Sequence, residues 1–169
     1  MKIKTRITFK EYVKLLYGLT YKKPMMIVIL CVGVAMIIWI TGYYLHYLPV
    51  PKPMFYQYTT LTLISVVQPL AIFLTIRKNY YSGNHLQEPL QIELLPEDIK
   101  MTGNSFYMEI KWEKMFKIVE LPNWFLLYQN NLSAIIIPKK AFNERQENEF
   151  RKILRSVKKV PVKLEKHSE

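Results

Sequence analysis

The chain has 169 residues, half of them hydrophobic, and a formal net charge of +11. This length leaves room for one small soluble domain beside any membrane-inserted part. The positive charge lies next to an apolar stretch, since residues 1–23 hold seven basic residues and one acidic residue. We therefore expect these charges to face a membrane surface and not nucleic acid. The single cysteine, Cys31, excludes an intramolecular disulfide.

Residues 1–23 predict a basic amphipathic N-terminal helix. Thr8 and Glu11 have the spacing of a capping box, in which a hydroxyl and a carboxylate satisfy the free N–H groups of the first turn. Apolar residues then recur at helical spacing, namely Phe9, Tyr12, Val13, Leu16 and Leu19. Such a helix could lie on the membrane interface or pack on the soluble domain, and the sequence leaves both arrangements open.

Two uncharged segments follow, at residues 24–48 and 54–76, each long enough to cross about 30 Å of hydrocarbon as a helix. Only Lys52 is charged between them, and it lies in a proline-rich turn at residues 49–53. We predict a transmembrane hairpin. Aromatic residues on both sides of the turn predict an interfacial belt, comprising Tyr43, Tyr44, Tyr47, Phe55, Tyr56 and Tyr58.

Basic pairs flank the hairpin at its outer ends. Lys22 and Lys23 precede the first segment, and Arg77 and Lys78 follow the second. Because positively charged flanks tend to stay in the cytoplasm, we expect both termini there. The four side chains are candidate contacts for anionic lipid headgroups.

The second apolar segment contains three features that could mediate contacts inside the membrane: Ser65, Gln68 and Pro69. Pro69 is expected to kink the helix, because it cannot donate a backbone hydrogen bond. A neutral amide such as Gln68 is better suited to helix–helix contact, within one chain or in a homo-oligomer, than to conduction. The alternative is a small oligomeric transporter or channel component with a cytoplasmic regulatory domain.

A polar connector at residues 77–88 leads into a region of short strands. Alternating apolar residues and turn residues predict a small antiparallel β-barrel or sandwich at residues 89–159, closed by a helix that Asn143 caps. A flexible tail is expected at residues 160–169. The expected strands cover residues 90–95, 99–102, 106–112, 116–120, 124–128 and 132–137.

Sequence signatures of catalysis are absent. The histidines have no partners at metal-ligand spacing, no glycine-rich phosphate loop occurs, and no serine lies in a nucleophile elbow. We therefore predict no enzyme and no catalytic, cofactor-binding or metal-ligating residue.

Four segments together resemble the bacterial YcxB-like family: residues 110–112, 125–128, 134–142 and 150–154. The most specific part is the junction in which a strand, Pro138, Lys139 and Lys140 precede the C-terminal helix. The resemblance implies two adjacent spans in the inner membrane of a bacterium and a cytoplasmic domain related to pleckstrin-homology folds. It implies no reaction and supplies no catalytic residues.

Together, the residues and the resemblance predict a non-enzymatic inner-membrane protein. The hairpin would anchor a cytoplasmic pleckstrin-homology-like domain, and this domain would bind a protein partner or an anionic lipid surface. Lys139 and Lys140 are the candidate contacts within the domain, because packing does not readily explain two adjacent lysines.

Overall fold

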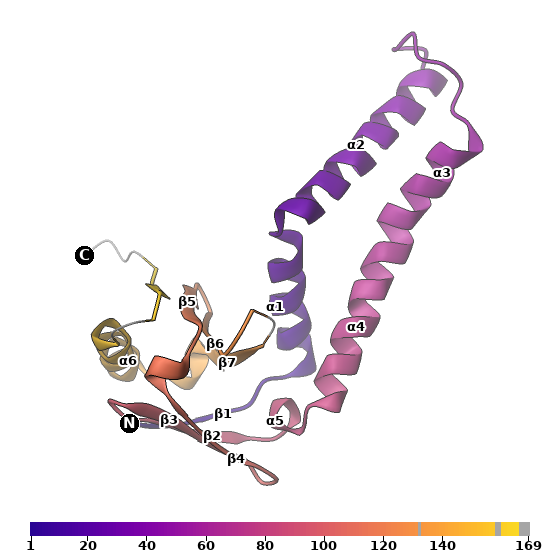
Figure 1. The fold of residues 1–169 in the computed structure, drawn as a ribbon. Coiled ribbons are helices and arrows are strands. Elements are labelled where there is room, and N and C mark those ends of the chain that lie inside the picture. The colour runs from indigo at the N-terminus through magenta and orange to yellow at the C-terminus, as the bar shows by residue number, and fades with distance from the viewer. Residues whose placement is uncertain (132, 158–159, 166–169) are drawn as a thin grey trace. The chain divides into compact units, whose positions relative to one another are not determined.

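The computed structural model describes residues 1–131, 133–157 and 160–165, apart from the side chains of residues 84 and 85. The chain folds into two compact units (Figure 1). One is a helical unit, Thr8–Gly83, and the other is a β-rich unit formed by Met1–Ile7 and the chain from Asn84 onward. The helical unit is therefore an insertion between the first and second strands of the β-rich unit.

The first sheet of the β-rich unit includes a strand from the N-terminus. Its antiparallel order is β1-β2-β3-β4, with β1 (Lys2–Thr5), β2 (Leu90–Leu94), β3 (Asp98–Thr102) and β4 (Tyr107–Lys111). Buried Ile3 and Thr5 alternate with exposed lysines in β1. The structure thus differs from the prediction of a single helical segment over residues 1–23. The first seven residues belong to the β-rich unit.

The second sheet has the order β7-β6-β5-β8, with β5 (Lys117–Leu121), β6 (Trp124–Tyr128), β7 (Ala134–Pro138) and the short β8 (Val162–Lys163). β8 runs parallel to β5 and the other pairs are antiparallel. Part of the expected flexible tail is therefore a strand, and residues 166–169 lie outside the described residues. The predicted antiparallel-sheet domain is confirmed, but its two sheets do not close into a barrel.

The core of the β-rich unit lies between the two sheets and α6 (Glu144–Ser156). Asn143 caps α6 as predicted, and its Oδ1 accepts the Gln146 backbone N–H at 2.8 Å. Phe150 of α6 is fully buried, with its ring centroid 4.9 Å from that of Phe125 and 6.3 Å from that of Trp112. Three short helical turns complete the unit: α5 (Asn84–Gln87) before β2, η2 (Trp112–Lys114) between β4 and β5, and η3 (Lys139–Ala141) between β7 and α6.

The helical unit contains two helices that are long and apolar enough to cross a membrane. The first is α2 (Pro24–Tyr44), which follows α1 (Phe9–Tyr21). The second is continuous over Phe55–Ser82 and consists of α3 (Phe55–Thr62), the π-helical turn η1 (Leu63–Val67) and α4 (Gln68–Ser82).

The π-helical turn lies where the proline was expected to disturb the helix. Just before Pro69, the backbone N–H of Gln68 donates to the carbonyl of Leu63, five residues earlier instead of four. The proline cannot donate a backbone hydrogen bond itself, so this wider turn accommodates it without ending the helix.

Candidate functional site

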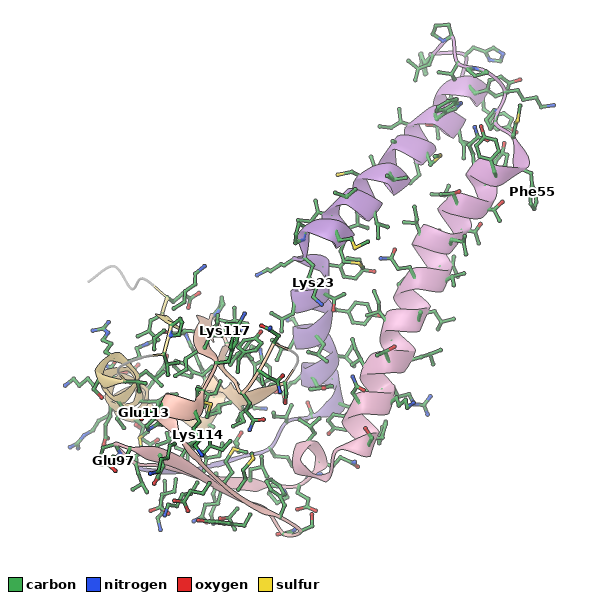
Figure 2. All side chains as sticks on the ribbon, viewed as in Figure 1. Lys23, Phe55, Glu97, Glu113, Lys114 and Lys117 are labelled. Carbon is green, nitrogen blue, oxygen red and sulfur yellow. The ribbon has the colours of Figure 1, made fainter. Side chains whose placement is uncertain are left out.

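The two long helices expose large apolar side chains along most of their length. The large exposed aliphatic residues on α2 are Met25, Ile27, Val28, Leu30, Val32, Val34, Ile37 and Ile38, and the large exposed apolar residues other than tyrosine on the second helix are Phe55, Leu63, Val66, Val67, Leu70 and Leu74. Monomeric soluble proteins rarely expose continuous apolar patches larger than a few hundred Å². Such a surface is suited to lipid or to other apolar partners. Figure 2 labels Lys23 and Phe55, which lie toward opposite ends of this surface.

The turn between the two helices is held by side chains from both of them. The indole Nε1 of Trp39 donates to the Pro51 carbonyl at 3.2 Å, and the hydroxyls of Tyr44 and Tyr58 lie 2.9 Å apart. Gln57 is buried, and its Oε1 accepts the backbone N–H of Met54 at 2.6 Å. Aromatic rings with polar edges therefore gather at this end of the hairpin, as in the interfacial belts of membrane proteins.

The structure separates the three candidate intramembrane contacts. Ser65 donates to the Leu61 carbonyl of its own helix at 2.7 Å. Gln68 reaches α2, where its Nε2 lies 3.4 Å from the sulfur of Met26. Its Oε1 is buried and has no hydrogen-bond partner among the described residues. The carbonyl of Pro69 accepts the Tyr17 hydroxyl of α1 at 2.7 Å. Gln68 and Pro69 thus contact other helices of the same chain.

The N-terminal helix α1 packs against α4 within the helical unit. The ring centroid of Phe9 lies 6.1 Å from that of Phe73 and 5.3 Å from that of Tyr80. Tyr12 and Tyr80 are both buried, with centroids 5.5 Å apart. The apolar stripe predicted for α1 therefore covers the second long helix, which is neither of the two arrangements expected from the sequence.

The four basic flanking residues lie at the surface of the helical unit. Lys22 and Lys23 occupy the break between α1 and α2, and both are exposed. Arg77 and Lys78 are exposed on α4.

An ion cluster lies around the fully buried Glu120 side chain of β5. Its Oε1 accepts hydrogen bonds from Lys139 Nζ at 2.7 Å and from Arg151, with Nη2 at 2.7 Å and Nε at 3.0 Å. Its Oε2 accepts the backbone N–H of Glu165 at 3.2 Å. Glu147 of α6 is hydrogen-bonded to Arg151 and lies 3.7 Å from the Lys139 ammonium. The cluster joins β5, η3 and α6.

The adjacent lysines proposed as surface contacts therefore have different surroundings. Lys139 is 11 % exposed, its ammonium is paired with Glu120, and it lies 5.3 Å from the ring centroid of Phe125. Lys140 is exposed. The ion cluster accounts for Lys139 within the fold, so Lys140 is the member of the pair that lies at the surface.

The cluster is stable in its charged form. Burial alone would raise the pKa of Glu120, but hydrogen bonds from Arg151 and Lys139, together with their positive charges, outweigh burial and hold that pKa below its usual range. The hydrogen bond with Glu120 raises the pKa of Arg151. The ion pair between Arg151 of α6 and Glu120 of β5 links the helix to the second sheet.

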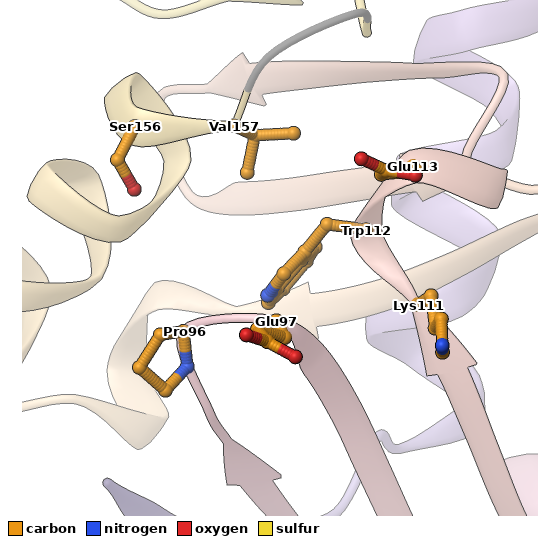
Figure 3. Close-up of a pocket in the computed structure, with 7 residues that line it drawn as sticks. All are labelled: Pro96, Glu97, Lys111, Trp112, Glu113, Ser156 and Val157. Carbon is orange, nitrogen blue, oxygen red and sulfur yellow. The ribbon is translucent and has the colours of Figure 1, made fainter.

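A pocket of about 410 Å³ opens in the β-rich unit beside Trp112 (Figure 3). The Trp112 indole is buried and its Nε1 donates to the Leu95 carbonyl at 2.9 Å, while Glu97 and Glu113 are exposed. In the part of the chain that the structure describes, no group of three or more His, Cys, Asp or Glu residues could hold a metal ion. The lining residues are Pro96, Glu97, Lys111, Trp112, Glu113, Ser156 and Val157.

Sequence reasoning missed both the ion cluster and this pocket. Each draws its residues from three or more segments that are far apart in the chain, and no local spacing links them. The one available signal for the cluster was Glu120, a carboxylate at an apolar position of a strand, which calls for a cationic partner.

The fold defines a class of protein in which an apolar helical hairpin is inserted into a two-sheet domain with a C-terminal helix. Residues 94–154 match the family model described as YcxB-like protein. The chain thus carries a YcxB-like domain, and the resemblance is confirmed over this segment, from the end of β2 to α6. No curated protein and no solved structure matches the chain.

Proposed function

We propose that this protein is a non-enzymatic component of the bacterial inner membrane. Its two long helices would anchor a pleckstrin-homology-like domain at the cytoplasmic face, where the domain binds a protein partner or the anionic lipid surface. The observation that carries this proposal is the exposed apolar surface of α2 and of the helix over Phe55–Ser82, which lipid would cover.

The topology of the β-rich unit supports a position on a single side of the membrane. β1 pairs with β2 in register, with Thr5 opposite Leu90, although the whole helical unit separates them in sequence. Two strands of one sheet must share a compartment, so the chain between them has to cross the bilayer an even number of times. The basic flanks of the hairpin support the cytoplasm as that compartment.

The order of elements supports the pleckstrin-homology-like assignment. A four-stranded antiparallel sheet is followed by three antiparallel strands of a second sheet and by α6, which packs on the core. The parallel strand β8 is an addition to that order.

The anchor is tested by expressing the full chain and extracting the membranes with alkaline carbonate. An inserted hairpin keeps the protein in the membrane pellet, whereas release into the supernatant would contradict the proposal.

The binding role is tested with the full chain in nanodiscs of zwitterionic or anionic lipid, by following hydrogen exchange in the β-rich unit. Lipid binding predicts protection around exposed Lys140 in anionic discs only, and Lys140→Ala should remove that protection. Lys139→Ala is unsuitable for this purpose, because Lys139 is paired with buried Glu120. If the lipid has no effect, the protein partner is favoured, and cross-linking in membranes should then capture a specific protein. Failure of both would contradict the binding role.

One observation favours the alternative of a transporter or channel component. The Oε1 of Gln68 is buried without a hydrogen-bond partner among the described residues, inside the helical unit. Flux through reconstituted vesicles that disappears in Gln68→Leu would support this alternative. Wild-type vesicles without any flux would remove it.

A further inference from the structure

We infer that the cytoplasmic edge of the hydrocarbon lies at the level of Lys22 and Lys23, beside Gln68 and Pro69. The rest of α4 and all of α1 then form a helix pair outside the hydrocarbon. The inference rests on the proposed membrane insertion, and it assigns the contact with lipid phosphate groups to Lys22 and Lys23 and not to Arg77 and Lys78.

The second long helix is longer than the hydrocarbon is thick, so part of it must lie outside. With a rise of 1.5 Å per residue, the 21 residues of α2 span about 31 Å, close to the hydrocarbon thickness of about 30 Å. The 28 residues of Phe55–Ser82 span about 42 Å, which exceeds that thickness by roughly 12 Å. At least about eight residues of the second helix must therefore leave the hydrocarbon unless the hairpin is strongly tilted. An edge at Gln68 keeps Phe55–Gln68 inside, a span of about 21 Å, and requires the bilayer to thin beside the second helix.

Contacts inside the helical unit identify the part that leaves. Met26 and Tyr17 lie on either side of the lysine pair in sequence, and they contact Gln68 and Pro69 respectively. The lysine pair is therefore level with Gln68 and Pro69. Arg77 lies nine residues beyond Gln68, or about 13 Å farther along the helix axis.

The side chains of α1 fit water or headgroups better than hydrocarbon. Tyr12 and Leu15 are buried against the rest of the unit, whereas Lys10 and Lys14 are exposed. An edge at Arg77 would place Lys14, Lys22 and Lys23 within the hydrocarbon. An edge at the lysine pair leaves the half-exposed Leu70 and Leu74 outside the hydrocarbon. Exposing these two leucines to water costs less free energy than burying three lysines in hydrocarbon.

Aromatic residues support the same level. Tyr17 and Tyr21 are stacked with their ring centroids 5.9 Å apart, next to the lysine pair. Tyrosine is enriched at both membrane interfaces. These rings would form the cytoplasmic counterpart of the belt around Tyr44 and Tyr58 at the opposite end of the hairpin.

The position of the edge divides the four basic residues into two groups. The headgroup region adds roughly 5–7 Å on each side of the hydrocarbon, which places Lys22 and Lys23 within it. Arg77 and Lys78, about 13 Å from the edge, lie beyond the headgroups and act on them only through a field screened over about 8 Å.

Cysteine labelling in native membranes tests the level of the edge. In a Cys31→Ser background, the single variants Val66→Cys, Leu74→Cys and Asn79→Cys are treated with a membrane-impermeant maleimide from the side of the β-rich unit. All three native side chains are exposed, so packing does not distinguish them. Because the reaction needs a hydrated thiolate, we expect Leu74→Cys to react within about threefold of Asn79→Cys and Val66→Cys at least about tenfold more slowly.

The outcomes separate this inference from the proposed function. A Leu74→Cys thiol as protected as that of Val66→Cys would place the edge near Arg77 and overturn the inference. A Val66→Cys thiol as reactive as that of Asn79→Cys would instead contradict membrane insertion itself.

A matched pair of charge variants tests the assignment of the headgroup contacts. Lys22→Gln/Lys23→Gln and Arg77→Gln/Lys78→Gln each remove two positive charges, so they change the net charge equally. In nanodiscs, the wild-type protein should unfold at a higher temperature with anionic than with zwitterionic lipid, and inorganic phosphate added to zwitterionic discs should not reproduce the shift. The first variant should lose most of that shift and the second should keep most of it. Equal losses, or no shift in the wild type, would overturn the assignment.

Discussion

A carboxylate can be fully buried at Glu120 because its partners are buried with it. Lys139 and Arg151 supply two positive charges, and the backbone N–H of Glu165 supplies a further donor. Replacing a buried ion cluster by apolar groups can be neutral, but removing one charge leaves the others poorly compensated. The residue is therefore more informative to mutate than any exposed glutamate.

We expect Glu120→Gln to lower the free energy of unfolding by about 3 kcal/mol, because Lys139 and Arg151 would keep their charges in a poorly hydrated site. Chemical denaturation followed by tryptophan fluorescence measures the change. Glu149→Gln on the exposed part of α6 is the matched control and should change stability by less than about 0.5 kcal/mol. A similar effect of both variants would contradict the role of the cluster.

The same cluster predicts how stability depends on acid. Since the pKa of Glu120 is lower in the folded than in the unfolded state, its stabilising contribution is complete above the unfolded pKa of about 4.3. The contribution is lost as the pH falls through the folded pKa. The difference in stability between the wild type and Glu120→Gln should therefore be constant near pH 7 and shrink below about pH 4. A difference that stays constant down to pH 3 would contradict this account.

Nothing in the surroundings of Gly18 requires a glycine at this position. It lies inside α1, and a Cβ added to it would meet no atom within 4 Å. Gly18→Ala should stabilise the protein by about 0.5–1 kcal/mol, because alanine loses less backbone entropy in a helix. Thermal unfolding in detergent micelles measures the effect.

Gly33 supplies the matched control for that prediction. An added Cβ there would lie 3.1 Å from the Cγ2 of Ile64, where the helices of the hairpin meet. Gly33→Ala should therefore gain less than Gly18→Ala or be destabilising. Loss of stability in Gly18→Ala would show that α1 needs the empty space.

At the scale of elements, β1 shows that the soluble domain does not begin at residue 89. Ile3 is buried in the core between the sheets, and Thr5 is paired with Leu90. A fragment of residues 84–165 lacks this strand and exposes one edge of β2. The domain is thus discontinuous in sequence.

Two fragments test the role of β1: residues 84–165 alone, and the same segment with residues 1–7 joined to residue 84 by a short Gly/Ser linker. We expect the first fragment to be less stable by about 2–5 kcal/mol, because it lacks the buried isoleucine of β1. The paired ends of β1 and β2 make such a linker feasible. Urea unfolding followed by circular dichroism measures the difference. Equal unfolding midpoints would show that β1 is dispensable.

The pairing of α1 with α4 also belongs to the scale of elements. Lysine near the bilayer centre costs roughly 2.5–3.5 kcal/mol and less toward the interface, so Lys14 of α1 and the Lys22–Lys23 pair after it would disfavour placing α1 in the hydrocarbon. Leaving Leu70 and Leu74 half exposed forgoes only about 2 kcal/mol in total. These magnitudes favour the lysine pair as the level at which an inserted second helix would leave the membrane.

At the scale of the whole molecule, the hairpin lies in sequence between two paired strands, so a hairpin inserted in a membrane should have both of its outer ends on the same side. Epitope tags at the two ends of the chain should be accessible from the same side of sealed vesicles, because β1 and β2 belong to one sheet. A tag inserted at Lys52 should be accessible from the other side. Protease protection measures both, and end tags on opposite sides would contradict the fold.

Much of the fold could be predicted from local patterns. Long uncharged runs predict apolar helices of membrane length, and alternation predicts strands, because both signals repeat within a few residues. The boundaries of α2, β6 and α6 follow these signals closely. The cap of α6 by Asn143 is equally local, since its partners are three residues away.

The sequence by itself thus determined the apolar hairpin, its basic flanks and the kinds of elements in the domain. Only the tertiary structure decided that β1 joins the domain, that Lys139 is held by Glu120 and that α1 covers α4. Each of these depends on groups that are far apart in the chain, so no periodicity or spacing reports them. A lysine pair looks the same in sequence whether both members face solvent or one of them neutralises a buried carboxylate.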